Sequence, residues 1–420
     1  HPEKMHAEIL TIGNELLSGK TLNTNASWIA ERLTEEGFSI MQITVVSDQH
    51  SEIIRALNES FQRSRLVIIT GGLGPTSDDV TKAALCTYFD SEMVHNKEVL
   101  NDIVDFFSKR NLELSERNRQ QAEVPEKATI FRNNMGTAPG LWLEKDKKIC
   151  IALPGVTSEM KNLMSNQVIP KLKSFITGYH ILHRTILTHG IGESFLSDKI
   201  AEWERALPGQ LKLAYLSSAG IVKLRLTATG EDEFKLKEAI SDAEQKLIKL
   251  IPQYIWGFDQ DTLEQVVGGL LAANGYTLAT AESCTGGQIA SRIVSVPGSS
   301  RYFRGTIVAY SNDIKTDLLG VDQSLINKFG AVSKEVVESM ALNGFRLLGS
   351  DFCVASSGIA GPDGGSVTKP VGMVWIAVAF RNHVQSRMFM FGDQRRNNIA
   401  RSCVASLAML REAILQTLAT

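Results

Sequence analysis

Several apolar runs in this chain open directly onto turns that contain glycine. Residues 65–70 read RLVIIT and lead into residues 71–74, and residues 148–153 lead in the same way into residues 154–157. A nearly continuous apolar run is typical of a parallel strand that is buried on both faces. Because these runs alternate with helical patterns, we expect an α/β fold.

The length of 420 residues exceeds what one hydrophobic core usually serves and favours two or three domains. Hydrophobic residues make up 43% and charged residues 21% of the chain, which excludes a disordered or a fibrous protein. The patterns predict two three-layer α/β domains, at residues 5–172 and 258–420, joined by a small α+β module at residues 180–252. We expect Met5 to be the natural start and exclude residues 1–4 from the fold prediction.

The hydrophobic periodicity predicts the elements of each part. In the first part, strands are expected at residues 8–12, 39–46, 65–70 and 148–153, with a helix at 25–36. In the middle part, strands are expected at 183–189, 212–216 and 221–229, with helices at 193–206 and 233–250, before a boundary at 251–261. In the third part, strands are expected at 277–281, 306–310, 351–356 and 372–380, with helices at 262–274, 288–294, 334–348 and 397–418.

Charge and cysteine content restrict the partners. The 44 Lys and Arg residues balance 46 Asp and Glu residues, and no dense basic run favours nucleic acid or an anionic membrane. We therefore expect a small-molecule partner. No apolar run approaches the roughly 20 residues that span a bilayer, and the five cysteines form no CxxC pair. We therefore expect a cytoplasmic protein without a disulfide framework or a zinc knuckle.

The glycine-rich turn at residues 71–76 precedes a predicted helix, an arrangement whose N–H groups and helix dipole favour an anion. It lacks the Gly-Lys pair of a Walker A loop and a complete GxGxxG, so neither nucleotide fingerprint is present. An alternative that needs no ligand is a capping box in which Thr76 is the N-cap and Asp79 its partner. Polar residues also follow the other strands of this part, at the edge where open α/β sheets bind ligands.

These stretches carry a family resemblance. TIGNELLSG at residues 11–19, TGGLGPTSDD at 70–79 and LPGVTSEM at 153–160 resemble the molybdopterin-binding-like domain of the CinA family. The resemblance implies a metal-dependent ADP-ribose pyrophosphatase on a fold shared with molybdopterin-cofactor enzymes. Pyrophosphate cleavage needs charge neutralised at two phosphates and a metal-held water, which carboxylates and backbone N–H groups supply.

The residues proposed for this site fall into two groups. The metal candidates, for a divalent ion with K⁺ as a further ion, are Asp48, Asp78 and Asp79. The substrate-binding candidates are Asn14, Glu15, Gly71, Gly72, Gly74, Thr76, Pro154 and Gly155. Asp48 can also be a solvated turn residue, and Glu15 a first-turn helix charge. Two other functions stay open: a nucleotide- or pterin-binding domain that regulates the third part, and adenylylation of molybdopterin.

The order of elements in the middle part is similar to a KH-type unit, and the CinA family carries such a module between its two main domains. RNA binding is not expected, because the turn at residues 190–194 carries Glu193 where a GxxG clamp would need basic neighbours. We interpret the module as a spacer or a dimerisation element, and we expect a homodimer.

In the third part, residues 279–288 place Ser283, Cys284 and Thr285 between a strand and a helix. The glycines that follow allow close approach of a substrate, and the helix N–H groups can hold an oxyanion or a phosphate. The alternative is that Ser283 or Thr285 only caps the helix. The next predicted helix begins with Asn312 as a plausible N-cap and has Lys315 in its first turn, where the helix dipole favours the neutral amine and so a base.

A further loop, SGIAGPDGG at residues 357–365, completes a pattern with AESCTGG and VAYSNDIK. Together the three stretches closely resemble the C-terminal domain of the CinA family, the nicotinamide-nucleotide amidases. The resemblance implies hydrolysis of nicotinamide mononucleotide to nicotinate mononucleotide and ammonia, with no cofactor. It assigns Ser283 as nucleophile and Lys315 and Tyr310 to its activation. The implied substrate-binding residues are Thr285, Gly286, Gly287, Ser357, Gly358, Gly361 and Arg396.

Two features of this assignment stay open. Cys284 is the rival nucleophile because thiolates are intrinsically better nucleophiles, although we expect its side chain to point elsewhere. The family usually has threonine at position 357 and arginine at position 394, where this chain has Ser357 and Gln394. Phosphate contact can therefore come from Arg395, Arg396 or Arg401, or this basic turn can simply be solvated.

Overall fold

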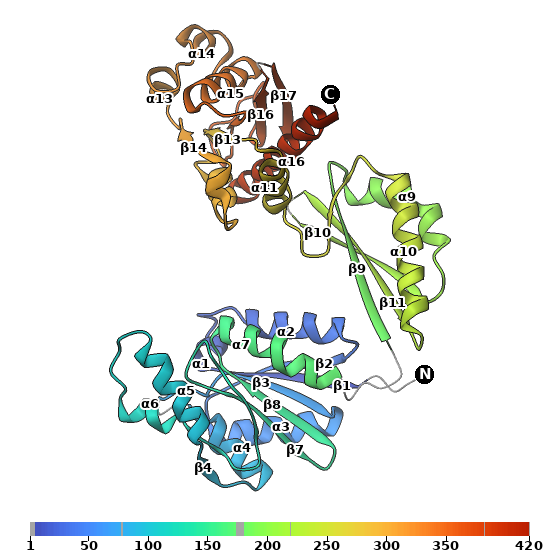
Figure 1. The fold of residues 1–420 in the computed structure, drawn as a ribbon, viewed down its shortest axis with the longest axis vertical. Coiled ribbons are helices and arrows are strands. Elements are labelled where there is room, and N and C mark those ends of the chain that lie inside the picture. Colours follow the sequence, from blue (N-terminus) through green and yellow to red (C-terminus); the bar gives the residue numbers. More distant parts are fainter. Residues whose placement is uncertain (1–4, 77–78, 174–179, 219, 382, 420) are drawn as a thin grey trace. The chain divides into compact units, whose positions relative to one another are not determined.

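The computed structural model describes residues 5–76, 79–173, 180–218, 220–381 and 383–419. The chain divides into two compact units, one formed by residues up to Leu182 with Thr229–Glu233, the other by His183–Ala228 with Phe234–Thr420. Figure 1 shows the helices and strands of both units.

The first unit contains a six-stranded sheet in the order β2-β1-β3-β8-β7-β6. Its parallel strands are β1 (His6–Ile12), β2 (Ser39–Val46), β3 (Leu66–Thr70) and β8 (Lys148–Leu153); β7 (Gly140–Lys145) and β6 (Thr129–Phe131) are antiparallel additions. Helices α2 (Thr24–Glu35) and α7 (Thr157–Leu163) pack on one face, and α3 (His50–Arg63) and α4 (Thr81–Phe89) on the other (Figure 1). This three-layer arrangement confirms the predicted α/β class.

Smaller elements surround this sheet. They are α1 (Asn14–Leu17), β4 (Met93–His95), α5 (Lys97–Ser108), α6 (Glu116–Gln120), β5 (Glu123–Pro125), a π-helical turn (Met164–Val168) and α8 (Ile169–Lys173). Gly71 ends β3 with φ +104°, and a Cβ at this position would collide with the carbonyl oxygen of Ile12. The two parallel strands β1 and β3 can therefore end side by side only with glycine here.

The middle module has a four-stranded sheet in the order β10-β11-β9-β12. Its strands are β9 (His180–His189), β10 (Leu211–Ser218), β11 (Ile221–Gly230) and β12 (Ile255–Phe258), with helices α9 (Glu193–Arg205) and α10 (Glu233–Leu250). Strand β12 pairs with β9 inside the segment 251–261, which the sequence analysis interprets as a boundary. This strand has only four residues, too few for a periodic pattern to be recognised.

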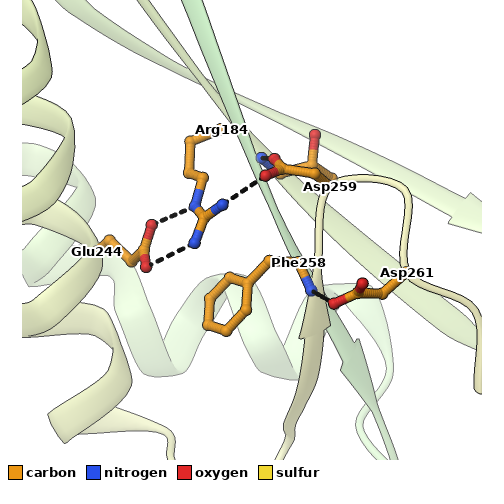
Figure 2. A network of polar contacts seen from close by, with 6 residues as sticks. Arg184, Glu244, Phe258, Asp259 and Asp261 are labelled. Carbon is orange, nitrogen blue, oxygen red and sulfur yellow. Dashed lines mark hydrogen bonds and ion pairs between the residues drawn. The ribbon is translucent and has the colours of Figure 1, made fainter. Parts of the chain in front are cut away.

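An arginine connects three elements of the middle module (Figure 2). The Arg184 guanidinium on β9 donates to both carboxylate oxygens of Glu244 on α10 and to the carboxylate of Asp259 after β12. Its Cζ also lies 4.5 Å from the ring centroid of Phe258. Asp259 adds a backbone connection, because its Oδ1 accepts from the Thr185 N–H over 2.9 Å. These contacts fix β12 and the residues that lead into the third domain.

The third domain has a five-stranded sheet in the order β14-β13-β15-β16-β17. The strands are β13 (Leu278–Glu282), β14 (Phe303–Val308), β15 (Phe352–Gly358), β16 (Met373–Phe380) and β17 (His383–Met390). Helices α11 (Leu263–Asn274), α12 (Gln288–Val294) and α16 (Arg395–Ala419) pack on one face, and α15 (Lys334–Leu348) on the other. Shorter helices are a 3-10 turn (Ser299–Arg301), α13 (Asn312–Asp317) and α14 (Gln323–Phe329).

Helix α16 is, in the described part of the chain, the one helix long and apolar enough to cross a membrane by length and composition, and 67% of its apolar window is buried inside the domain. Such burial is typical of a core helix. The expectation that no apolar segment approaches this length is therefore corrected.

Candidate functional sites

The third domain contains a cavity of about 190 Å³ where β13 and β15 end. Three side chains that the sequence analysis joins into one catalytic group line it together: Ser283, Lys315 and Tyr310. The remaining lining residues are Cys284, Asn312, Ala331, Val332, Ser357, Gly358, Ala360 and Arg395. The fold thus brings residues from five separate sequence stretches to one site.

Glu282, immediately before Ser283, is completely buried. Its Oε2 accepts hydrogen bonds from the N–H groups of Gly287 over 2.9 Å and Ile289 over 3.1 Å, and its Oε1 accepts from the N–H of Ala290 over 2.8 Å. These donors include the amides at the start of α12, which the sequence analysis assigns to an oxyanion or a phosphate. That assignment is wrong for these amides, because a carboxylate of the chain itself already binds them.

The Glu282 carboxylate also holds the turn that it precedes. The Thr285 hydroxyl donates to Glu282 Oε2 over 2.7 Å and lies 2.7 Å from Ser356 Oγ on β15. Thr285 is 1% exposed and does not line the cavity, so the structure corrects its assignment as a substrate contact. Gly286 and Gly287 follow with φ of +58° and +92°, a conformation that favours glycine at both positions. The turn is therefore rigid, with its shape set by Glu282.

Cys284 is among the residues that line the cavity of Ser283, and it also belongs to the hydrophobic core of the domain. The expectation that its side chain points away from the site stays a prediction. Burial raises the pKa of its thiol to about 12, and the nearby Glu282 charge acts in the same direction. A thiol with this pKa is almost entirely protonated at neutral pH, and the thiolate is the reactive form. Ser283 therefore remains the better nucleophile candidate.

Lys315 is 2% exposed, and its Nζ donates to the carbonyl oxygen of Tyr310 over 3.1 Å. Burial lowers its pKa below the usual lysine range. The physical cause differs from the one that the sequence suggests, since Lys315 lies in the last turn of α13 and desolvation, not the helix N-terminus, favours the neutral amine. The N-cap is Ser311, whose side chain accepts from the Ile314 N–H, so Asn312 is left to line the cavity.

Tyr310 lies after the end of β14 and is 59% exposed. The predicted strand 306–310 corresponds to β14, which begins three residues earlier and ends two residues earlier. This strand lies at the edge of the sheet, and its side chains alternate between half-buried and exposed. Arg395 Nη2 donates to Tyr310 Oη over 2.9 Å, and Arg395 Nη1 donates to the Gly361 carbonyl oxygen over 2.8 Å. The structure therefore places Arg395 at the cavity, whereas Arg396, the predicted contact, does not line it.

Ser357 and Gly358 line the cavity as predicted. The Ser357 hydroxyl donates to the carbonyl oxygen of Ala331 over 2.7 Å and so supports the wall formed by residues 331 and 332. Lys369 Nζ donates to the Val332 carbonyl oxygen over 2.7 Å from the other side. Gly361 contributes its carbonyl oxygen to Arg395 and is not itself part of the lining.

The first unit has a larger cavity, of about 400 Å³, at the carboxyl ends of β1, β3 and β8. Most of the residues that the sequence analysis selects for this domain line it: Glu15, Asp48, Gly71, Gly72, Gly74, Asp79, Pro154 and Gly155. Asn14 and Thr76 do not line it, and Asp78 lies outside the described residues. The sheet thus brings four separated sequence segments to one edge.

Asp79 contacts Thr76 as the predicted capping box requires. Its Oδ2 accepts hydrogen bonds from the Thr76 N–H over 2.8 Å and from the Thr76 hydroxyl over 2.5 Å. Thr76 is not the N-cap, however, since α4 begins at Thr81 after Val80. Asp48 has a buried Oδ1 without a hydrogen-bond partner. No group of three or more His, Cys, Asp or Glu side chains suited to a metal occurs among the described residues. Asp48 and Asp79 nevertheless fit an ion such as Mg²⁺, which one or two carboxylates and substrate phosphates commonly hold.

Gln121 and Glu159 are among the cavity residues that were not predicted. Gln121 follows α6 and is 2% exposed, and no sequence pattern marks it. Glu159 belongs to the LPGVTSEM stretch and lines the cavity, and its Oε2 accepts from Asn133 Nδ2 over 2.7 Å. Burial raises the pKa of the Glu159 carboxyl. Glu159 could have been predicted from the sequence, because it lies in the LPGVTSEM stretch that resembles the CinA family.

The folds define a chain in which two three-layer α/β domains, each with a cavity at the strand ends, flank a KH-like module. Family models match each part: "Probable molybdopterin binding domain" at residues 8–174, "Damage-inducible protein CinA KH domain" at 183–257 and "CinA C-terminal domain" at 260–414. The chain belongs to the CinA family.

Relatives support this over the full length. A CinA-like protein of Cytophaga hutchinsonii is 44% identical, covering 98% of both chains, and one of Flavobacterium psychrophilum is 44% identical, covering 98% of this chain and 99% of the relative. Among solved structures, competence/damage inducible protein CihA from Agrobacterium tumefaciens is 38% identical, with a TM-score of 0.35, and covers 36% of this chain and 93% of that one.

Proposed function

We propose that the third domain is a serine amidase that hydrolyses the carboxamide of nicotinamide mononucleotide. The neutral Lys315 amine takes the Ser283 hydroxyl proton as Ser283 Oγ attacks the carboxamide carbon, and the lysine then protonates the departing nitrogen, which leaves as ammonia. Water hydrolyses the resulting ester by the same proton route, releases nicotinate mononucleotide and regenerates Ser283. The amide of Cys284, a residue that lines the cavity and whose N–H Glu282 does not bind, is the candidate donor to the oxyanion.

The observation that carries this proposal is the buried Lys315 amine, which shares a small cavity with Ser283 and has a lowered pKa. A base must be neutral near the working pH to accept a proton, and burial favours that state. A phosphate on the substrate would be favoured at Arg395, because α16 begins there with no acidic residue in its first turn.

Ammonia release from nicotinamide mononucleotide tests the amidase. Wild type, Ser283→Ala and Cys284→Ala are compared with a chelator present. We expect release by wild type and Cys284→Ala, and loss with Ser283→Ala of at least about 10³-fold. Loss in Cys284→Ala, with its fold intact by circular dichroism and with Ser283→Ala still active, would transfer the nucleophile role to the thiol. No release by folded wild type would reject the amidase.

We further propose that the first domain hydrolyses ADP-ribose to AMP and ribose 5-phosphate. Asp48 and Asp79 would hold a divalent cation, which supplies charge neutralisation at the two phosphates. The chain's own contribution is the glycine turn, which lets a pyrophosphate approach the backbone, and Glu159, whose raised pKa suits proton transfer. A cytoplasmic homodimer without nucleic-acid or membrane partners remains a prediction of the sequence.

The alternative for this domain is binding without catalysis, which the absence of a three-residue metal group among the described residues favours. ADP-ribose turnover with Mg²⁺ or another divalent ion, compared between wild type, Asp48→Asn and the exposed control Asp105→Asn, separates the two. Turnover that only Asp48→Asn removes supports the pyrophosphatase. Tight ADP-ribose binding without turnover supports a regulatory module.

A further inference from the structure

The first-unit cavity contains a buried amide that the protein itself leaves without a partner. Gln121 is 2% exposed and lines the cavity, and its side-chain Oε1 is fully buried with no hydrogen-bond partner. An unpaired buried amide is costly, and natural proteins satisfy nearly all such groups. Gln121 lines the cavity as a residue, while its unpaired oxygen lies just beneath the cavity surface. A ligand group supplies the missing donor when the side chain turns and brings this oxygen to the cavity.

The backbone of Gln121 is held firmly, so the orphan oxygen does not result from a loose segment. Its N–H donates to the Asn118 carbonyl oxygen over 3.2 Å, and its carbonyl oxygen accepts from Lys82 Nζ over 3.1 Å. Lys82 Nζ also donates to the Glu123 carbonyl oxygen over 2.9 Å. The ammonium group of Lys82 thus fixes the chain on both sides of Ala122, and the Gln121 side chain is presented from a rigid position.

The chemistry of the cavity indicates which part of a ligand Gln121 meets. The glycine turn of residues 71–74 suits the phosphates, which carry only acceptors. An amide oxygen cannot bind an acceptor and requires an N–H or O–H group. In a nucleotide these donors are the amino group of the base and the hydroxyls of the sugar.

We propose that Gln121 is a ligand-recognition residue whose side-chain oxygen accepts a hydrogen bond from an amino or hydroxyl group of a nucleotide bound in this cavity. The proposal deepens the proposed ADP-ribose function and rests on it for the choice of ligand. It concerns binding specificity and assigns Gln121 no part in bond cleavage.

The test compares Gln121→Met, which keeps the side-chain length without the amide, with Gln120→Met, its exposed neighbour on α6. Thermal midpoints are first measured without ligand. Gln121→Met should melt at or above the wild-type midpoint, because an apolar side chain removes an unsatisfied buried group. A midpoint lowered by several degrees, with Gln120→Met unchanged, would show a structural role and overturn the proposal.

Calorimetric titration then measures Kd for ADP-ribose, for its inosine analogue, which lacks the amino group, and for a 2′-deoxyadenosine analogue, each with and without Mg²⁺. Gln121→Met should raise Kd for ADP-ribose at least about tenfold. For the analogue that lacks the donor recognised by Gln121, the variant and the wild type should have the same Kd. Three outcomes would overturn the proposed role of Gln121. They are unchanged binding of ADP-ribose, equal weakening of all three ligands, and weakening that occurs only with Mg²⁺. If wild type binds no ADP-ribose, the pyrophosphatase proposal fails, and the thermal comparison alone decides the role of Gln121.

Discussion

Arg395 Nη2 donates a hydrogen bond to Tyr310 Oη over 2.9 Å and so joins the start of α16 to the residue that follows β14. The phenol and the guanidinium therefore occupy the mouth of the Ser283 cavity as one polar unit. This relationship separates Arg395 from its neighbour Arg396, although both are exposed and adjacent in sequence.

Arg395→Gln should raise KM for nicotinamide mononucleotide about 10- to 100-fold with a smaller effect on kcat, because a phosphate contact is present in ground and transition states alike. Arg396→Gln is the matched control and should stay within about twofold of wild type. Steady-state ammonia release measures both. The reverse order of effects would restore Arg396 as the phosphate contact.

The pH dependence of the amidase should report Lys315. Its pKa is lowered by burial, so the neutral, basic amine becomes populated at lower pH than in an ordinary lysine, and kcat should rise with pH through that lowered pKa. Lys315→Arg keeps the charge and should be inactive throughout, whereas the exposed control Lys334→Arg should keep the wild-type profile. A pH-independent kcat in wild type would exclude Lys315 as the base.

The lowered pKa of Lys315 should also make the stability of the folded chain increase with pH in the alkaline range. In the unfolded chain Lys315 keeps its proton up to the normal lysine pKa near 10.4, whereas in the folded chain it loses the proton at a lower pH. Between the folded and the unfolded pKa the unfolded chain binds more protons, so the free energy of unfolding should rise with pH. Lys315→Met should flatten this part of the midpoint-against-pH curve. Thermal midpoints at several alkaline pH values measure it, and an unaltered slope in Lys315→Met would contradict the assignment.

Glu282→Gln should lower the thermal midpoint of the third domain and reduce amidase activity. The amide group of the introduced glutamine would place its own N–H donors against the N–H groups of Gly287, Ile289 or Ala290. Loss of these buried, charge-assisted hydrogen bonds should lower the free energy of unfolding by about 2–3 kcal/mol. Glu335→Gln, on the first turn of α15, is the control. Full activity in Glu282→Gln would show that the turn holds its shape without the carboxylate.

The Cys284 thiol should react slowly with iodoacetamide near pH 8, because its pKa of about 12 leaves little thiolate. In Glu282→Gln the removed negative charge should speed the reaction at the same pH. Mass-spectrometric rates of Cys284 alkylation measure both. Rapid alkylation of wild type would indicate an activated cysteine and reopen its role as nucleophile.

Several regular elements were predicted from the sequence, although the amphipathic helices α3 and α5 were not. The strands Ser39–Val46 and Lys148–Leu153 and the helices Glu233–Leu250, Gln288–Val294 and Lys334–Leu348 have the expected bounds. Strand β17 was missed because its side chains are only partly buried and carry no continuous apolar pattern. Glycine turns at strand ends located both cavities, since the topology of parallel sheets places these ends at one edge.

The individual contacts within each cavity were less predictable. The capture of the α12 amides by Glu282 depends on the path of the turn, which the letters ESCTGG do not specify. Arg395 and Arg396 are equivalent in the sequence, and only the direction in which α16 begins brings one of them to the cavity. Gln121 is a polar residue at the end of a short helix, and its burial arises from long-range packing alone.

The buried carboxylate of Glu282 has a consequence for how proteins built on this plan can change substrates. A negative charge already belongs to the turn that carries Ser283, so a second anion placed there would meet repulsion and find the amides occupied. Residue changes that adapt the site to a different acidic group on the substrate should therefore accumulate at the start of α16 and in residues 358–361. The turn itself should tolerate little change, which keeps the reacting group constant while the rest of the substrate is free to diversify.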